Sequence, residues 1–141
     1  MEIRTKGLQL SLKPLRNVDD EDWVRVMVVA SAPGFSAELE AWLQAGDITR
    51  FADECRALYD TLGKNGRAIL QSAEPDIHVT LESNALGHIA GRYALESERP
   101  KGIPTVLRGS FEMDQSYLPE LEEGARRLAT ELGKPSAVSS L

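Results

Sequence analysis

The sequence is short of the residues that most often perform chemistry, with one cysteine, Cys55, and two histidines among 141 residues. A single cysteine excludes an internal disulfide and a cysteine-rich zinc site. No run of about 18 apolar residues occurs, so we expect no segment that spans a membrane. The first residues also lack the basic stretch and apolar core of a signal peptide. We therefore expect a cytoplasmic protein.

Positive charge is also scarce. The chain has 16 Lys and Arg against 22 Asp and Glu, which gives a formal net charge of -6. An acidic protein is repelled by a nucleic-acid backbone and by an anionic membrane, so we expect neither as a partner. The same charge permits a basic protein partner.

Hydrophobic patterning predicts a series of strands and two helices. Short alternating or β-branched runs predict strands at 3–12 (one or two strands), 23–30, 35–43, 67–72, 76–83, 87–96 and 104–112. Apolar residues at helical spacing predict a helix from the N-cap Asp47 to Gly63, and a second helix that begins near Pro119 and ends before Gly133. We predict an α+β fold, with a strongly curved antiparallel sheet of seven or eight strands and two packed helices.

The length fits one globular domain over 1–135 with a C-terminal tail at 136–141. Each half carries strands followed by an acidic linker and an amphipathic helix, FADECRALYDTLG in the first and LEEGARRLATELG in the second. This similarity between the halves has two alternative explanations. One is an old duplication, and the other is that strand–strand–helix units are common in proteins.

Two hairpins can be placed by their turns. The turn Ala32-Pro33-Gly34 joins 23–30 to 35–43, with Phe35 on the side that faces the core. In the hairpin around 83–87, hydrophobic matching predicts two apolar pairs on one face, Leu81 with Ile89 and Ile77 with Tyr93. That register places His78 opposite Arg92 and His88 opposite Glu82. The two imidazoles are then about 13 Å apart and cannot share a metal ion.

No catalytic constellation emerges from the remaining residues. Cys55 lies within an apolar helical stripe, which predicts a buried structural thiol. Gly91 lies inside a strand pattern, where it permits a bulge or sheet curvature. Glu38 and Glu40 lie about 7 Å apart on one strand face. A glycosidase pair has that spacing, but so does any alternating acidic strand. We predict no enzyme activity, no metal and no cofactor.

An acidic and aromatic patch is the best candidate for binding. Trp42 shares its strand face with Glu38 and Glu40, and it either packs on the helix start or anchors a basic partner. The acids Asp19, Asp20, Glu21 and Asp22 form a solvated loop or steer such a partner electrostatically. We take these seven residues as the candidate partner-binding set.

Three segments together resemble the WapI-type bacterial immunity proteins, namely PGFSAELEAWLQAGDITRFADECRALYDTL, EPDIHVTLESNALGHIAGRY and LRGSFEMDQSYLPELEEGARRLATEL. The resemblance covers about residues 23–132. It implies an antitoxin-like protein that binds a cognate toxin domain and blocks its active site or substrate surface. Such toxins are often nucleases with basic clefts, which an acidic inhibitor would complement. The resemblance assigns no binding residues. The alternative is a small-molecule-binding protein with its ligand between the sheet and a helix.

Overall fold

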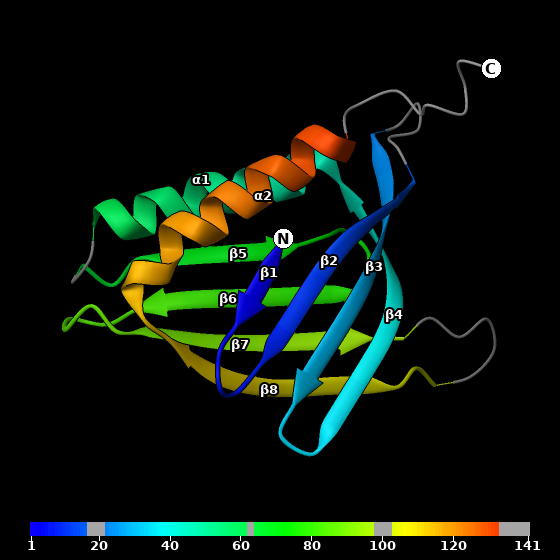
Figure 1. Cartoon of the computed structure of the whole chain (residues 1–141), viewed down its shortest axis with the longest axis horizontal. Coiled ribbons are helices and arrows are strands. Elements are labelled where there is room, and N and C mark those ends of the chain that lie inside the picture. Colours follow the sequence, from blue (N-terminus) through cyan, green and yellow to red (C-terminus); the bar gives the residue numbers. More distant parts are fainter. Residues whose placement is uncertain (17–21, 62–63, 98–102, 133–141) are drawn as a thin grey trace.

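The structure, a computed structural model, describes residues 1–16, 22–61, 64–97 and 103–132. Two units of four strands and a helix follow one another along the chain (Figure 1). The first unit contains β1 (Glu2–Arg4), β2 (Gln9–Arg16), β3 (Trp23–Ala32), β4 (Phe35–Gln44) and α1 (Ala45–Asp60). The second contains β5 (Arg67–Gln71), β6 (Ile77–Ser83), β7 (Ile89–Glu96), β8 (Val106–Met113), a short 3-10 helix (Gln115–Tyr117) and α2 (Leu118–Leu132).

The strands form two antiparallel sheets, each with its four strands in chain order. The predicted α+β class, with eight strands and two helices, is confirmed. The strands are divided between two sheets, whereas the sequence suggested one. The division falls where α1 interrupts the succession of hairpins between β4 and β5.

The two helices pack against each other, α1 also against β5 and α2 also against β1 and β2. Figure 1 shows that the strands of the two sheets cross and that both helices lie on the same side of the molecule. The core between these layers is mainly aliphatic, and the largest fully buried side chain is Phe51 of α1. Burying one large apolar side chain stabilises the fold by about 1.5–3 kcal/mol, so this core dominates the stability.

The tip of the β3–β4 hairpin extends beyond the core, and residues 33–36 are exposed. Ala32 pairs with Phe35, and Gly34 between them has φ +82°, which confirms the predicted turn. The prediction that Phe35 faces the core is wrong, because its side chain is 65% exposed. Only the last part of β4 meets the helix layer, so Ala41 and Leu43 are the residues of this strand that are fully buried.

The predicted register of the β6–β7 hairpin is wrong by two residues. Leu81 pairs with Gly91, and Ile77 pairs with Leu95. The shift leaves every side chain on its predicted face, because side chains along a strand alternate with a period of two. Hydrophobic matching therefore found the correct face without the correct partners.

The loop between β6 and β7 explains this shift. The Asn84 side chain accepts hydrogen bonds from the backbone N–H groups of Leu86 (2.8 Å) and His88 (3.1 Å). Ser83 consequently pairs with Ile89 at the end of the ladder. An Asx turn of this kind depends on hydrogen bonds to the Asn side chain, so the hydrophobic pattern of the strands does not predict it.

The new register corrects the surroundings of both histidines. His78 lies opposite Ala94, and Arg92 lies opposite Thr80. Glu82 lies opposite Ala90 and not opposite His88. Both histidines are exposed, and His78 Nε2 lies 3.2 Å from the Thr80 hydroxyl.

Of the two roles predicted for Gly91, the bulge is absent, and a part in sheet curvature stays a prediction. The ladder between β6, β7 and β8 continues through it without a bulge. It lies opposite Phe111, and a Cβ atom at Gly91 would lie 2.2 Å from Cζ of that ring. The next pair reverses the arrangement, with the Tyr93 ring over Gly109. Each glycine therefore makes room for an aromatic ring on the neighbouring strand.

Asp47 is not the N-cap of α1. The helix begins at Ala45 after the N-cap Gln44, and Asp47 is its third residue. The Asp47 carboxylate accepts a hydrogen bond from the Gln44 N–H at 2.9 Å, which is half of a capping box. Asp47 does mark the start of the helix, as predicted, but it lies at the N3 position and not at the N-cap.

The start of α2 agrees with the prediction to within one residue. The 3-10 helix before it is capped by Asp114, whose carboxylate accepts the Ser116 N–H at 2.8 Å. The predicted helix-ending glycines Gly63 and Gly133 lie outside the described residues, as does the predicted tail 136–141.

Candidate functional site

The predicted acidic patch lies on the outer face of β4. Glu38 and Glu40 are both exposed, and Glu40 pairs with Arg25 of β3, with 3.2 Å between Oε2 and Nε. The Arg25 guanidinium also lies over the Trp42 ring, 5.6 Å from its centre. The patch therefore contains a cation that the prediction did not include, and it offsets part of the charge of Glu40.

Trp42 is half-buried, and its backbone connects this patch to the second sheet. Its backbone N–H donates a hydrogen bond to Oδ2 of Asp76 at 3.0 Å. Asp76 comes just before β6, so this bond joins the first sheet to the second. This bond holds the Trp42 backbone where the two sheets meet, and both predicted roles of its side chain stay predictions.

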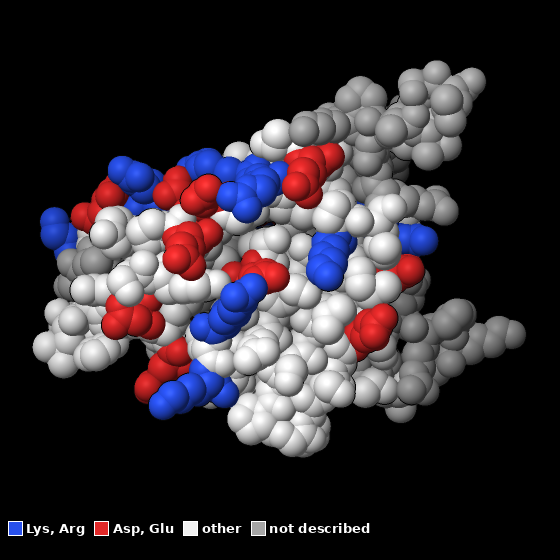
Figure 2. Space-filling view, viewed as in Figure 1, with Lys and Arg blue, Asp and Glu red and all other residues white. Residues whose placement is uncertain are grey.

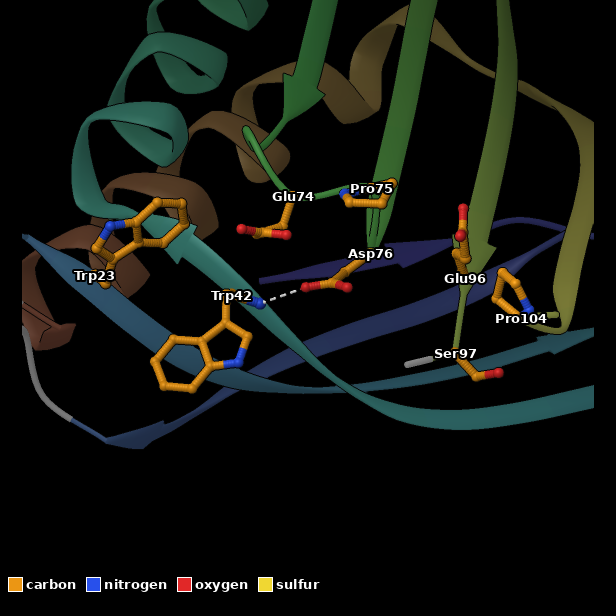
Figure 3. Close-up of a pocket in the computed structure, with 8 residues that line it drawn as sticks. All are labelled: Trp23, Trp42, Glu74, Pro75, Asp76, Glu96, Ser97 and Pro104. Atoms are coloured by element: carbon orange, nitrogen blue, oxygen red, sulfur yellow. Dashed lines mark hydrogen bonds between the residues drawn. The ribbon is translucent and has the colours of Figure 1, made fainter. Parts of the chain in front are cut away.

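A cleft of about 390 Å³ opens at this junction. We call it the tryptophan cleft, and its lining residues are Trp23, Trp42, Glu74, Pro75, Asp76, Glu96, Ser97 and Pro104 (Figure 3). The two tryptophans come from β3 and β4 of the first unit. The three carboxylates come from the second unit, from the β5–β6 turn and from the end of β7.

Asp76 is the most buried carboxylate of the tryptophan cleft, with 8% of its surface exposed. This burial raises the pKa of Asp76, and the neighbouring charges of Glu74 and Glu96 raise it further. The hydrogen bond from Trp42 opposes this shift. Within the described part of the chain, none of the three carboxylates forms an ion pair with a lysine or arginine.

The predicted steering acids are described only at Asp22. This residue is exposed, has φ +67°, and directly precedes Trp23 of the tryptophan cleft. Its carbonyl oxygen lies 3.4 Å from the Ala45 nitrogen that donates to it. Asp19, Asp20 and Glu21 lie outside the described residues.

Cys55 is buried in α1, as predicted. Burial raises the pKa of its thiol to about 12, and the charge of Glu122 adds to the shift. Such a thiol is protonated at neutral pH and is a poor nucleophile. Among the described residues, no three His, Cys, Asp or Glu side chains gather where they could hold a metal ion. In the same residues, no helix is both long and apolar enough to cross a membrane.

Comparison with known families resolves what the geometry leaves open. The sequence model of the family described as "Immunity protein WapI-like family" matches residues 2–132. The chain belongs to the WapI-like immunity protein family. The predicted resemblance is confirmed, and the match begins at residue 2 where the resemblance began near residue 23.

Other comparisons add less than this family match. The search of curated proteins found no match. Among solved structures, the crystal structure of WHY1 from Arabidopsis thaliana is 11% identical, covers 94% of this chain and 89% of that chain, and has a TM-score of 0.46. Membership of the WapI-like family supports an immunity role, and it implies a toxin protein as partner in general terms.

Of the residues that line the tryptophan cleft, only Trp42 was among the site residues predicted from the sequence. The predicted hairpin over 23–43 already implied that Trp23 and Trp42 lie at the same end, since antiparallel pairing brings them together. Glu74, Asp76 and Glu96 were missed. They reach the tryptophans only because the two sheets pack against each other, and no local pattern reports that contact.

Proposed function

We propose that this WapI-like protein binds a cognate toxin domain through its acidic and aromatic surface and thereby neutralises it. The observation that carries the proposal is the family match over residues 2–132. The net charge of -6 supports a basic partner, such as a nuclease with a positively charged cleft. The candidate partner-binding residues are Glu38, Glu40 and Trp42, with Asp19, Asp20, Glu21 and Asp22 as steering charges.

The geometry supports this function more than it supports an enclosed small-molecule site. The described core between the sheets and helices is filled with aliphatic side chains. The tryptophan cleft lies at the surface, and three carboxylates share it with its apolar walls. Figure 2 shows acidic and basic side chains intermingled over the two helices. That face therefore has no continuous surface of one charge for a basic partner.

The direct test uses a toxin domain encoded beside this gene. The purified immunity protein should bind that domain and abolish its activity in a stoichiometric titration. A toxin of another group, mixed in the same way, serves as the control. If the protein neither binds nor inhibits any neighbouring toxin domain, the proposed function is wrong.

The acidic patch can be tested by charge reversal at a single position. Glu38 is exposed on β4, and Glu112 is exposed on β8 of the other sheet. Glu38→Lys and Glu112→Lys change the net charge equally, so they separate a local effect from a global one. We expect Glu38→Lys to slow toxin association more and to weaken its dependence on salt. Equal effects from both variants would remove the β4 face from the proposal.

A further inference from the structure

The tryptophan cleft combines features that suit a planar cation. Indole rings attract cations through their faces, and arginine adds stacking of its flat guanidinium group. The chain itself contains such a pair, since Arg25 lies over Trp42 at 5.6 Å. The ring that borders the tryptophan cleft therefore already accepts a guanidinium on the outer side of β4.

The carboxylates of the tryptophan cleft lie where that cation would need them. Figure 3 shows Asp76 projecting between Trp42 and Glu96, with Glu74 on the side of Trp23. Asp76 is more than nine-tenths buried and is held by the Trp42 N–H at 3.0 Å. A fixed and desolvated carboxylate is a stronger partner for a guanidinium than a mobile surface acid.

The opposite junction between the two units shows that an open cleft is not required by the fold. There the β1–β2 turn meets β8, and the two segments are in direct contact. A Cβ atom at Gly7 would lie 3.1 Å from Cβ of Phe111 and 3.3 Å from the carbonyl oxygen of Ser110. The fold can close this kind of junction by packing, yet it leaves the tryptophan cleft open.

We propose that the tryptophan cleft binds an arginine side chain of the toxin domain, with Trp23 and Trp42 as walls and Asp76 as the anion that receives the guanidinium. This inference rests on the proposed function for the identity of the partner. It adds a specific subsite and a specific side chain to a surface that was otherwise defined only by charge.

The first experiment needs no toxin. N-acetyl-arginine amide is titrated into the protein, and the indole N–H signals of Trp23 and Trp42 are followed by NMR. N-acetyl-citrulline amide, which is neutral and nearly the same shape, is the matched probe. We expect the arginine probe to shift both indole signals and the citrulline probe to leave them in place. Equal shifts from both probes, or shifts confined to other residues, would overturn the proposal.

Variants then locate the charge that matters. Asp76→Asn keeps an oxygen that can accept the Trp42 N–H, and Glu112→Gln removes one exposed charge on β8, outside the tryptophan cleft. We expect Asp76→Asn to weaken binding of the arginine probe about tenfold or more, which corresponds to 1.4 kcal/mol, while Glu112→Gln leaves that binding unchanged. If Asp76→Asn does not fold, the side-chain carboxyl carbon of Asp76 in the wild type is followed by NMR during the arginine titration, and an unmoved signal contradicts the proposal. Unchanged affinity in the folded variant contradicts the proposal.

The chain also carries two cations, Arg99 and Lys101, in a segment that lies outside the described residues. A variant with glutamine at both positions tests whether they compete for the tryptophan cleft. We expect the same affinity for the arginine probe as in the wild type. A large gain in affinity would assign the cleft to the chain's own cations and would overturn the proposal.

The last experiment repeats the comparison with the toxin domain. We expect Asp76→Asn to weaken toxin binding more than Glu112→Gln does. If the wild type binds the toxin and Asp76→Asn binds it equally well, the cleft proposal fails and the proposed function stands. If the arginine probe binds in the cleft and no toxin is bound, the proposed function fails together with the toxin as source of the arginine.

Discussion

The two units of this protein have the same order of elements and fill their cores differently. The inner face of the first sheet is aliphatic, with Val24, Val26 and Val28 along β3. The second sheet instead places Tyr93 and Phe111 across from glycines. The shared order supports an old duplication, which stays a hypothesis. The difference shows that one topology accepts two ways of packing.

The junctions between the units differ as well. At one junction the Gly7 turn packs directly on Phe111. At the other, the first unit supplies the tryptophans of the tryptophan cleft and the second supplies its carboxylates. A site made from both units exists only when both are folded and docked. The two units therefore share the order of elements that forms the scaffold. The cleft arises because the two junctions between the units differ.

The largest expected effect tests whether the two units unfold as one domain. Phe51 of α1 is fully buried, and α1 packs on both α2 and β5. We expect Phe51→Ala to lower the free energy of unfolding by about 3–5 kcal/mol, because it leaves a cavity between the units. Denaturant unfolding measures this loss, and amide exchange locates it. Protection should fall equally in β3 and in β7. Protection that falls only in β3 would mean that the units unfold separately.

A second change tests the glycine and aromatic pairs of the second sheet. Gly91→Ala should lower the free energy of unfolding by about 1–3 kcal/mol, since the new methyl group meets the Phe111 ring. Thermal unfolding measures the loss. Gly46→Ala is the control, because a Cβ there would have no atom within 4 Å other than its chain neighbours and the backbone of its own helix. In the double variant with Phe111→Leu the two losses should not add. Simple additivity would show that the ring does not restrict position 91.

A third change compares the two helix starts. Asp47 is buried, accepts the Gln44 N–H and pairs with Arg50 at 3.1 Å. We expect Asp47→Ala to lower the free energy of unfolding by about 1 kcal/mol through loss of the capping box. Asp114→Ala, at the exposed start before α2, should cause a smaller loss. Chemical denaturation of both variants measures the difference, and a larger loss at Asp114 would reverse this ranking of the two starts.

The smallest effect concerns pH and the junction that carries the tryptophan cleft. Because the folded state raises the pKa of Asp76, it binds that proton more tightly than the unfolded chain does. The contribution of Asp76 to the free energy of unfolding therefore falls as pH rises above about 4. Asp76→Asn lacks this fall, so its stability relative to the wild type should improve between pH 3.5 and 7. Stability curves measured at both pH values test this sign, and a relative loss at pH 7 would contradict it.

Much of this fold could be predicted from the sequence because local patterns record it. Alternation located the strands, and the turn at Pro33 and Gly34 set the first hairpin. The apolar stripe around Cys55 identified α1 and the burial of the thiol. These features depend on neighbours in the chain, so a single sequence is enough to find them.

The errors have two physical causes, local side-chain chemistry in a turn and contacts between distant segments. The first applies to the β6–β7 register, which was decided by the Asn84 side chain and not by apolar matching. Phe35 looked like a core residue because alternation cannot tell how far the helix layer extends. The partner of Trp42 could not be predicted, since Asp76 approaches only after the second sheet has packed.

The single cysteine has a practical consequence for everyone who studies this chain. Its sulfur lies in the core beside the second helix and is protonated at neutral pH. A thiol-labelling reagent should therefore react only in molecules whose helix layer has opened. The rate of labelling then reports how often the folded protein opens, with no engineered probe and no change to the sequence. Adding a tightly bound partner should slow that rate, and this would give a readout of binding that does not depend on the partner's own activity.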